Sequence, residues 1–123
     1  MKKQNPTEMS AEQLVQRFTL IALAQDEADL SGQHSKYNRL YDEMEAVKAE
    51  LKSRDDDMRR ALLPLVEHSN PQVRLKAAIA VLALAPEIAR ARLQKIWDAK
   101  EFPQAAHASG MLDALDEGRY VPS

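Results

Sequence analysis

Apolar residues recur at spacings of three and four along most of the chain, in six segments separated by turn residues. This spacing places apolar side chains on one face of an α-helix, whereas a half-buried strand would need strict alternation. No stretch alternates long enough to form a strand, and the breaks between segments are short. Short connections favour antiparallel neighbouring helices. We therefore expect an all-α protein whose six helices form three antiparallel hairpins.

Capping residues predict the bounds of the first two helices. Ser10 and Gln13 have the spacing of a capping box, which predicts a helix that begins after Ser10. The pair Ser31-Gly32 is typical of a helix end. A second helix is expected from about Ser35 to Lys52, with one apolar and one charged face.

The third segment combines an acidic cluster with an internal proline. Ser53 could cap this helix, and Asp55 to Asp57 would then occupy its first turn, where carboxylates stabilise the helix dipole. Pro64 would remove one backbone donor inside the segment and should bend the helix there.

Prolines also predict the bounds of the last three helices. Asn70 is a good N-cap with Pro71 at the first helical position, and the helix should continue to Ala85. Its second half is apolar on all sides, which is typical of a central helix. Pro86 should begin the fifth helix, and the last is expected from about Pro103 until Gly118.

The run from Ala61 to Ala85 carries a family resemblance. It resembles one HEAT repeat, with a proline-containing apolar helix, an Asn-Pro-x-Val-Arg turn and an alanine-rich second helix. With segments 37–44 and 102–111, the chain is similar to small bacterial HEAT-like proteins of unassigned function, over about residues 36–118. The resemblance implies a HEAT/armadillo-like α-α superhelix. In HEAT proteins the arginine that corresponds to Arg74 commonly pairs with an acidic turn residue of the neighbouring repeat; the equivalent turn position here is Asn70.

Length and composition limit the class of protein. At 123 residues, 45% of them hydrophobic, we expect a single HEAT-like helical domain over residues 1–123, with an ordered core at about 8–118. The absence of cysteine excludes disulfides and thiolate metal sites, which suits a protein of the reducing cytoplasm. We therefore expect a cytoplasmic location. We expect no export signal and no membrane span.

No residue pattern predicts catalysis or a cofactor. His34, His68 and His107 lie far apart, and none has a second ligand at helical spacing. His107 and Ser109 are two residues apart, so on a helix they would not face each other. The three aspartates at 55–57 lack the spacing of a calcium-binding loop. We therefore expect a non-catalytic protein without metal or cofactor.

A basic stretch offers the best candidate surface, because six basic residues face two acidic ones between residues 71 and 100. The basic residues are Arg74, Lys76, Arg90, Arg92, Lys95 and Lys100. An exposed, solvated helix face that keeps the protein soluble is the more common explanation of such a group. Trp97 and Phe102 lie near this stretch and could anchor a partner, although a tryptophan at such a position is more often part of the core.

Two binding functions remain open. We expect a helical-repeat module that mediates protein–protein interaction, with another protein or with a second copy of itself. An immunity or adaptor-like role would suit such a scaffold. The candidate contact residues are Arg74, Arg90, Arg92, Lys95, Tyr37 and Tyr41. The alternative is a HEAT-like protein that binds nucleic acid, which the net charge of −2 and the few aromatic residues disfavour.

Overall fold

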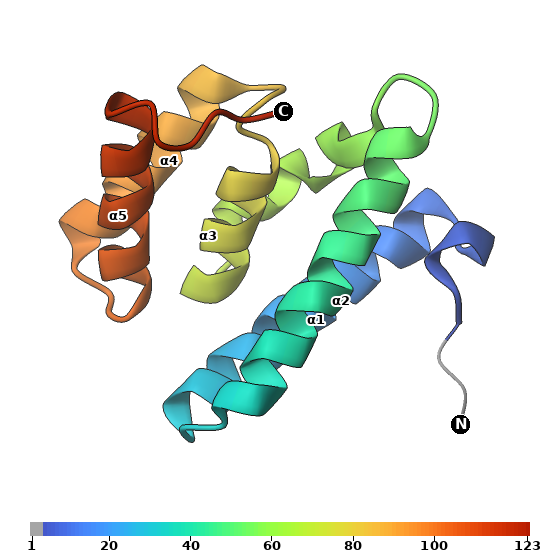
Figure 1. Ribbon diagram of the computed structural model, residues 1–123, viewed down its shortest axis with the longest axis horizontal. Coiled ribbons are helices and arrows are strands. Elements are labelled where there is room, and N and C mark those ends of the chain that lie inside the picture. The colour runs from blue at the N-terminus through green and yellow to red at the C-terminus, as the bar shows by residue number, and fades with distance from the viewer. Residues whose placement is uncertain (1–3) are drawn as a thin grey trace. The chain divides into compact units, whose positions relative to one another are not determined.

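The protein is all-α. The structure, a computed structural model, describes residues 4–123, and these contain helices and no β-strand (Figure 1). The α-helices are α1 (Ala11–Leu30), α2 (His34–Ser53), α3 (Pro71–Ala80), α4 (Pro86–Ala99) and α5 (Gln104–Asp116). The 3-10 helices are η1 (Pro6–Glu8) and η2 (Met58–Glu67). The all-α class is thus confirmed, and every one of the six predicted segments is helical.

The chain divides into two compact units, one up to Ala61 and the other over Leu62–Ser123. The boundary falls inside η2. The single domain expected from the chain length stays a prediction. No helix among residues 4–123 is both long enough and apolar enough to cross a membrane.

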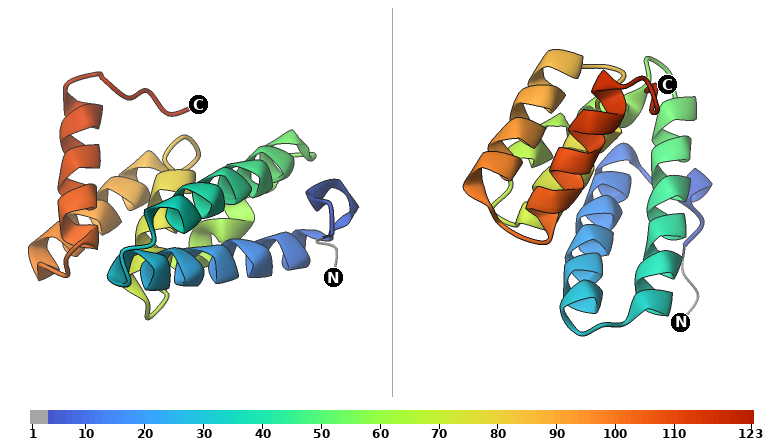
Figure 2. Two further views of the ribbon diagram at one scale, coloured as in Figure 1. Left: turned by 60° about the horizontal axis from the view of Figure 1, so that its bottom comes forward. Right: turned by 60° about the vertical axis from the view of Figure 1, so that its left-hand side comes forward.

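Helices α1 and α2 form an antiparallel hairpin in the first unit (Figures 1 and 2). The predicted capping box is present, because Gln13 N donates to Ser10 Oγ at 3.1 Å and Ser10 N donates to Gln13 Oε1 at 2.9 Å. At the far end of α1, Gly32 has a φ of 69° and the next amide donates to Ala28 O at 2.8 Å. This left-handed residue ends α1 and reverses the chain into α2.

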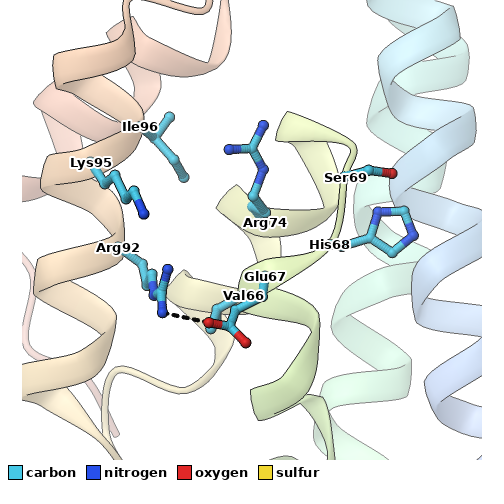
Figure 3. A pocket seen from close by; sticks show the side chains of 8 residues that line it. All are labelled: Val66, Glu67, His68, Ser69, Arg74, Arg92, Lys95 and Ile96. Carbon is cyan, nitrogen blue, oxygen red and sulfur yellow. Dashed lines mark hydrogen bonds and ion pairs between the residues drawn. The ribbon is translucent and has the colours of Figure 1, made fainter.

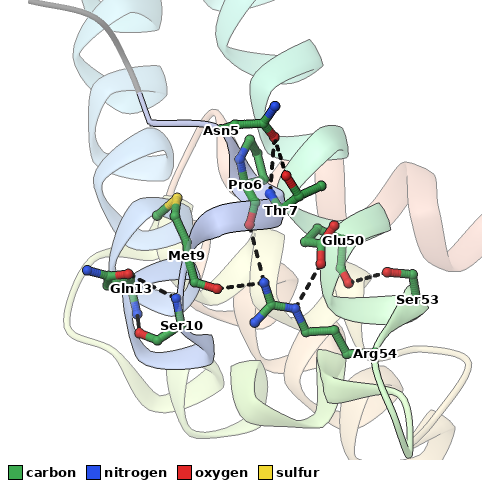
Figure 4. A network of polar contacts seen from close by, with 9 residues as sticks. All are labelled: Asn5, Pro6, Thr7, Met9, Ser10, Gln13, Glu50, Ser53 and Arg54. Carbon is green, nitrogen blue, oxygen red and sulfur yellow. Dashed lines mark hydrogen bonds and ion pairs between the residues drawn. The ribbon is translucent and has the colours of Figure 1, made fainter.

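Arg54 ties the start of the first unit to the end of α2 (Figure 4). Its Nη2 donates to Met9 O at 2.6 Å and to Pro6 O at 3.2 Å, and its Nε donates to Glu50 Oε2 at 2.8 Å. One guanidinium therefore bonds to two backbone carbonyls, Met9 O and Pro6 O, of which Pro6 O also accepts from Met9 N at 3.1 Å.

The predicted start of the third helix is wrong. Ser53 is the last residue of α2, and its hydroxyl donates to Glu50 O at 2.7 Å instead of capping a new helix. Asp56 and Asp57 have positive φ values of 61° and 51°. Aspartate tolerates the left-handed region because its short side chain bonds to nearby groups. Here the Asp57 carboxylate accepts hydrogen bonds from Arg59, so the aspartates form a turn and not a helical first turn.

The third segment is a 3-10 helix that contains Pro64. In an α-helix the ring of Pro64 would clash with the carbonyl four residues earlier, and the missing amide would break the bonding pattern. The expected bend is therefore replaced by a change of helix type over the whole of η2. Leu62 and Val66 are buried, as expected of the apolar stripe.

In the second unit, α3 begins as predicted and ends early. Asn70 Oδ1 accepts from Gln72 N at 2.8 Å and from Val73 N at 3.2 Å, with Pro71 at the first helical position. The helix ends at Ala80, not at Ala85, and a turn follows until Pro86 begins α4. Most α3 side chains are excluded from solvent, which confirms the prediction that this helix is central.

Helix α4 packs against both α3 and α5. α5 also contacts α3, where Gln104 Nε2 donates to Gln72 Oε1 at 3.0 Å. Both side chains are buried, so this hydrogen bond offsets the cost of removing two amides from water. These contacts hold α4 at a fixed position beside the end of η2, where the candidate site lies.

Candidate binding site

A pocket in the second unit lies between the η2–α3 turn and α4 (Figure 3). Its volume is about 420 Å³. The lining residues are Val66, Glu67, His68, Ser69, Arg74, Arg92, Lys95 and Ile96. We call this the basic pocket, because three of the eight are arginine or lysine.

Helix α4 contributes two of the cations. Arg92 and Lys95 are three residues apart, so they lie on the same side of the helix, and Figure 3 shows both extending toward the η2–α3 turn. Arg92 Nη2 contacts Glu67 Oε1 at 2.7 Å. The Glu67 side chain is 68% exposed, so its carboxylate remains largely accessible to solvent, whereas the Arg92 side chain is half-buried at 31%.

The third cation, Arg74, comes from α3 on the opposite side of the basic pocket (Figure 3). Its Nη2 contacts Glu101 Oε1 at 3.1 Å, in the turn between α4 and α5. The Nε–H of the same guanidinium is buried and has no hydrogen-bond partner within residues 4–123. This donor is closed to solvent, so Arg74 acts on the pocket through its charge.

His68 and Ser69 contribute little to the charge of the pocket. His68 Nδ1 accepts from Asn70 N at 3.0 Å, and Figure 3 shows both side chains directed away from the cations. The charges of the basic pocket are therefore the three cations and Glu67, and with Glu101, the partner of Arg74 outside the lining, the formal net charge is about +1. Such a site suits an oxyanion, since guanidinium groups can donate two parallel hydrogen bonds to one.

The structure brings together half of the predicted contact residues. Arg74, Arg92 and Lys95 line the basic pocket. Arg90 lies outside it and pairs with Asp116 at 2.8 Å. Tyr37 and Tyr41 belong to α2 in the first unit and take no part in the pocket; Tyr41 is exposed and Tyr37 half-buried.

Two members of the predicted basic group have other roles. Lys76 is only 6% exposed, so its placement on a binding surface is wrong, because the central α3 is covered on this side as well. The Lys100 amine lies 3.2 Å from the centre of the Trp97 ring, a cation–π contact. Trp97 in turn meets Phe102 edge-on at 6.3 Å, which leaves Phe102 exposed beside a half-buried tryptophan.

Sequence reasoning missed Glu67. It is a single acidic residue at the end of η2, 25 residues before the arginine that it contacts. Neither helical spacing nor charge patterning connects residues so far apart, and only the packing of α4 beside the turn brings them together.

The histidines remain separate, and no group of three metal-binding side chains gathers anywhere in the described part of the chain. The pKa of His107 is lowered, although this residue lies on the exposed side of α5. Loss of surrounding water, and to a lesser extent the positive charge of Lys76, lower the pKa of His107 from 6.5 to about 4. The residue is therefore neutral at pH 7.

Comparisons with known proteins give one family and one close structural relative. Residues 12–116 match the family described as "Domain of unknown function (DUF2019)". The crystal structure of the protein RPA1889 from Rhodopseudomonas palustris CGA009 is similar, with 45% sequence identity and a TM-score of 0.94. That similarity covers 98% of this chain and 100% of the other. No curated protein matches the chain. The family description names no activity, so function has to be argued from the site.

Proposed function

The chain belongs to the DUF2019 family, and from this premise we propose that it is a non-catalytic, HEAT-like helical-repeat module that binds a protein partner through an acidic segment of that partner. The HEAT-like part of the proposal includes the stacking of three helix hairpins into an α-α superhelix. The binding part assigns the basic pocket as the contact site.

The pairing of Arg74 supports the HEAT-like assignment. In the HEAT proteins that this chain resembles, the corresponding arginine commonly pairs with an acidic residue in the turn of the neighbouring repeat. Here Arg74 pairs with Glu101, which lies in the turn of the next helix pair, α4 and α5. Asn70, which occupies the equivalent turn position in the sequence, caps α3.

The observation that carries the binding proposal is the convergence of Arg74, Arg92 and Lys95 on one hollow. Cations on an evenly solvated helix face would point into water in different directions. These three come from two helices and surround a single space, where they outnumber the two carboxylates that pair with Arg74 and Arg92 and so attract an acidic side chain. Charge complementarity of this kind gives specificity and fast association.

Affinity capture with matched variants tests the proposal. Bait proteins carrying Arg92→Glu or Lys95→Glu should lose a bacterial protein that the unaltered chain retains. Arg90→Glu is the matched control, because it reverses a charge on the same helix outside the basic pocket. A partner lost equally from the Arg90 and Arg92 variants would mean that overall charge, and not the pocket, governs binding.

The salt dependence of binding separates a protein partner from nucleic acid. Duplex or single-stranded DNA should bind weakly and lose affinity steeply as the salt concentration rises. Micromolar binding of either DNA at physiological salt, abolished by Arg92→Glu, would overturn the proposal in favour of a nucleic-acid ligand.

A further inference from the structure

We propose that Glu67 is an internal ligand of the basic pocket and that a carboxylate of the bound partner replaces it on Arg92. This inference rests on the proposed function and names the group that the pocket recognises. In the free protein the Glu67 carboxylate holds the Arg92 guanidinium in position; in the complex it moves into solvent while the incoming carboxylate takes the same donors.

The Arg92–Glu67 pair has the properties of a replaceable contact. One ion-pair contact joins the two groups, between Nη2 and Oε1 at 2.7 Å, although a guanidinium can donate to a carboxylate through two nitrogens. The carboxylate is 68% exposed, so it can return to water without crossing buried structure. An exposed ion pair of this kind is only slightly more stable than the two separated, solvated charges, by about fivefold or less.

The charges around the basic pocket favour a carboxylate as the incoming group. With Glu67 in place the pocket is close to neutral, apart from the charge of Lys95, since Arg92 and Arg74 each have a carboxylate partner. One monoanion that enters as Glu67 leaves preserves this balance. A phosphate dianion would bring an additional negative charge beside Glu67 and Glu101, which opposes binding.

The two other cations explain why an incoming carboxylate can displace Glu67. Lys95 lies one helical turn from Arg92 on α4 and lines the same space, and it forms no ion pair within residues 4–123. Arg74 adds a second guanidinium charge at the opposite wall, although its Nε–H is buried and out of reach of a ligand. A partner carboxylate inside the pocket can therefore reach the Lys95 amine, a donor that the side chain of Glu67, attached at the rim, leaves unused.

A direct titration tests the replacement. The probe is a capped hexaglutamate peptide, and NMR follows the Nε–H signal of Arg92 together with the dissociation constant. The unaltered protein should show a shift of the Arg92 signal, and Arg92→Gln should weaken binding by about tenfold. Glu67→Gln removes the competing carboxylate and should tighten binding by roughly two- to fivefold.

Asp116→Asn is the matched control for Glu67→Gln. Asp116 is 66% exposed and contacts Arg90 of α4 at 2.8 Å, so its neutralisation changes the net charge by the same amount at a carboxylate about as exposed as Glu67. Its affinity for the peptide should equal that of the unaltered protein. Equal tightening in both variants would overturn the role of Glu67, and so would inorganic phosphate that binds the pocket more tightly than the peptide at matched ionic strength.

The two proposals fail in different ways. If partner capture requires Arg92 while Glu67→Gln leaves the peptide affinity unchanged, the pocket binds the partner without displacement of Glu67. If capture is independent of Arg92, the proposed function fails whatever the effect of Glu67→Gln.

Discussion

Arg54 donates a 2.6 Å hydrogen bond to the backbone carbonyl of Met9, which lies 45 residues earlier in the chain. The contact joins η1 to the end of α2 in the first unit, and a second bond to Pro6 and an ion pair with Glu50 complete the set. Met9 O follows the last residue of a short 3-10 helix, so the guanidinium supplies it with a charged donor.

Replacing Arg54 with alanine should destabilise the first unit by about 1–3 kcal/mol, because the carbonyls of Pro6 and Met9 lose the hydrogen bonds that the guanidinium donates to them. Native-state amide hydrogen exchange measures the change, with the largest loss of protection at Met9 and in the last turn of α2. Arg39→Ala is the control, since Arg39 is exposed on the same helix and its pair with Glu43 spans 4.0 Å. An equal effect of both substitutions would contradict a specific role for Arg54.

The aspartate turn allows the same substitution at two adjacent left-handed residues. Asp56→Gly relieves a left-handed backbone but adds freedom to the unfolded chain, so the stability should change by about 0.5 kcal/mol or less. Asp57→Gly has the same backbone effect and also removes the carboxylate that accepts two hydrogen bonds from the buried guanidinium of Arg59. Urea unfolding at pH 7 should therefore show Asp57→Gly to be about 1–3 kcal/mol less stable than Asp56→Gly.

The pH dependence of these variants provides a further check. Hydrogen bonds from Arg59 hold the pKa of Asp57 below its usual value of 3.8. Below pH 3.8 the unfolded chain takes up a proton that the folded protein still excludes, so this contribution to stability falls as the pH falls through the lower native pKa. The difference in the free energy of unfolding between Asp57→Gly and the unaltered protein should decrease over that range. A difference that is constant with pH would contradict the Asp57–Arg59 pair.

Local signals in the sequence predicted most of the helices. The capping box of Ser10 and Gln13, the stop at Gly32 and the Asn70-Pro71 start all depend on residues within four positions of one another, and all three are confirmed. Hydrogen bonds of such short range form in the same way wherever the helix packs. This is why α1 begins and ends, and α3 begins, close to their predicted positions.

Competition between local preferences explains the two errors in the fold. Ser53 and three aspartates satisfied the pattern of an N-cap and an acidic first turn, yet the same side chains also stabilise turns, and the Arg59 contact decides between the two. The segment after Ala80 is apolar and was expected to remain helical. It leaves the helix as a turn although Val81 and Leu82 stay buried, so burial alone did not specify the helix.

The sequence predicted which basic residues contribute to the candidate site, but not which of them lie together or which acidic residues pair with them. The excess of basic residues between positions 71 and 100 singled out Arg74, Arg92 and Lys95, and charge counting needs no structure. It could not separate Arg90, which faces Asp116, or Lys76, which is buried. Glu67 and Glu101 escaped notice because each lies about 25 residues from its arginine.

His107 makes stability depend on pH between about 4 and 6.5. Over this window the unfolded chain binds a proton at the histidine while the folded protein does not, because loss of surrounding water and Lys76 lower the native pKa to about 4. The unfolded state therefore holds more protons, and stability falls as the pH falls from 6.5 toward 4. The effect is reduced by solvent screening, since the ring is on the exposed side of α5.

His107→Gln should flatten this part of the stability profile, measured as urea midpoints at half-unit steps of pH. His34→Gln is the control, because His34 is exposed at the start of α2 and changes the number of histidines equally. A profile that flattens in the His34 variant and not in the His107 variant would contradict the assignment.

Two glycines should respond to alanine with opposite signs. Gly32 has a φ of 69° at the end of α1, where alanine would force a side chain into the left-handed region at a cost of about 1 kcal/mol. Gly110 lies inside α5, and a Cβ built there meets nothing within 4 Å, so alanine should stabilise the helix by about 0.5–1 kcal/mol. Neither substitution fills a cavity or removes a contact, which leaves backbone conformation as the cause of the difference. In thermal unfolding, the melting temperature of Gly32→Ala should be lower than that of the unaltered protein, and that of Gly110→Ala should be higher. Two shifts of the same sign would contradict the backbone assignment at one of the two positions.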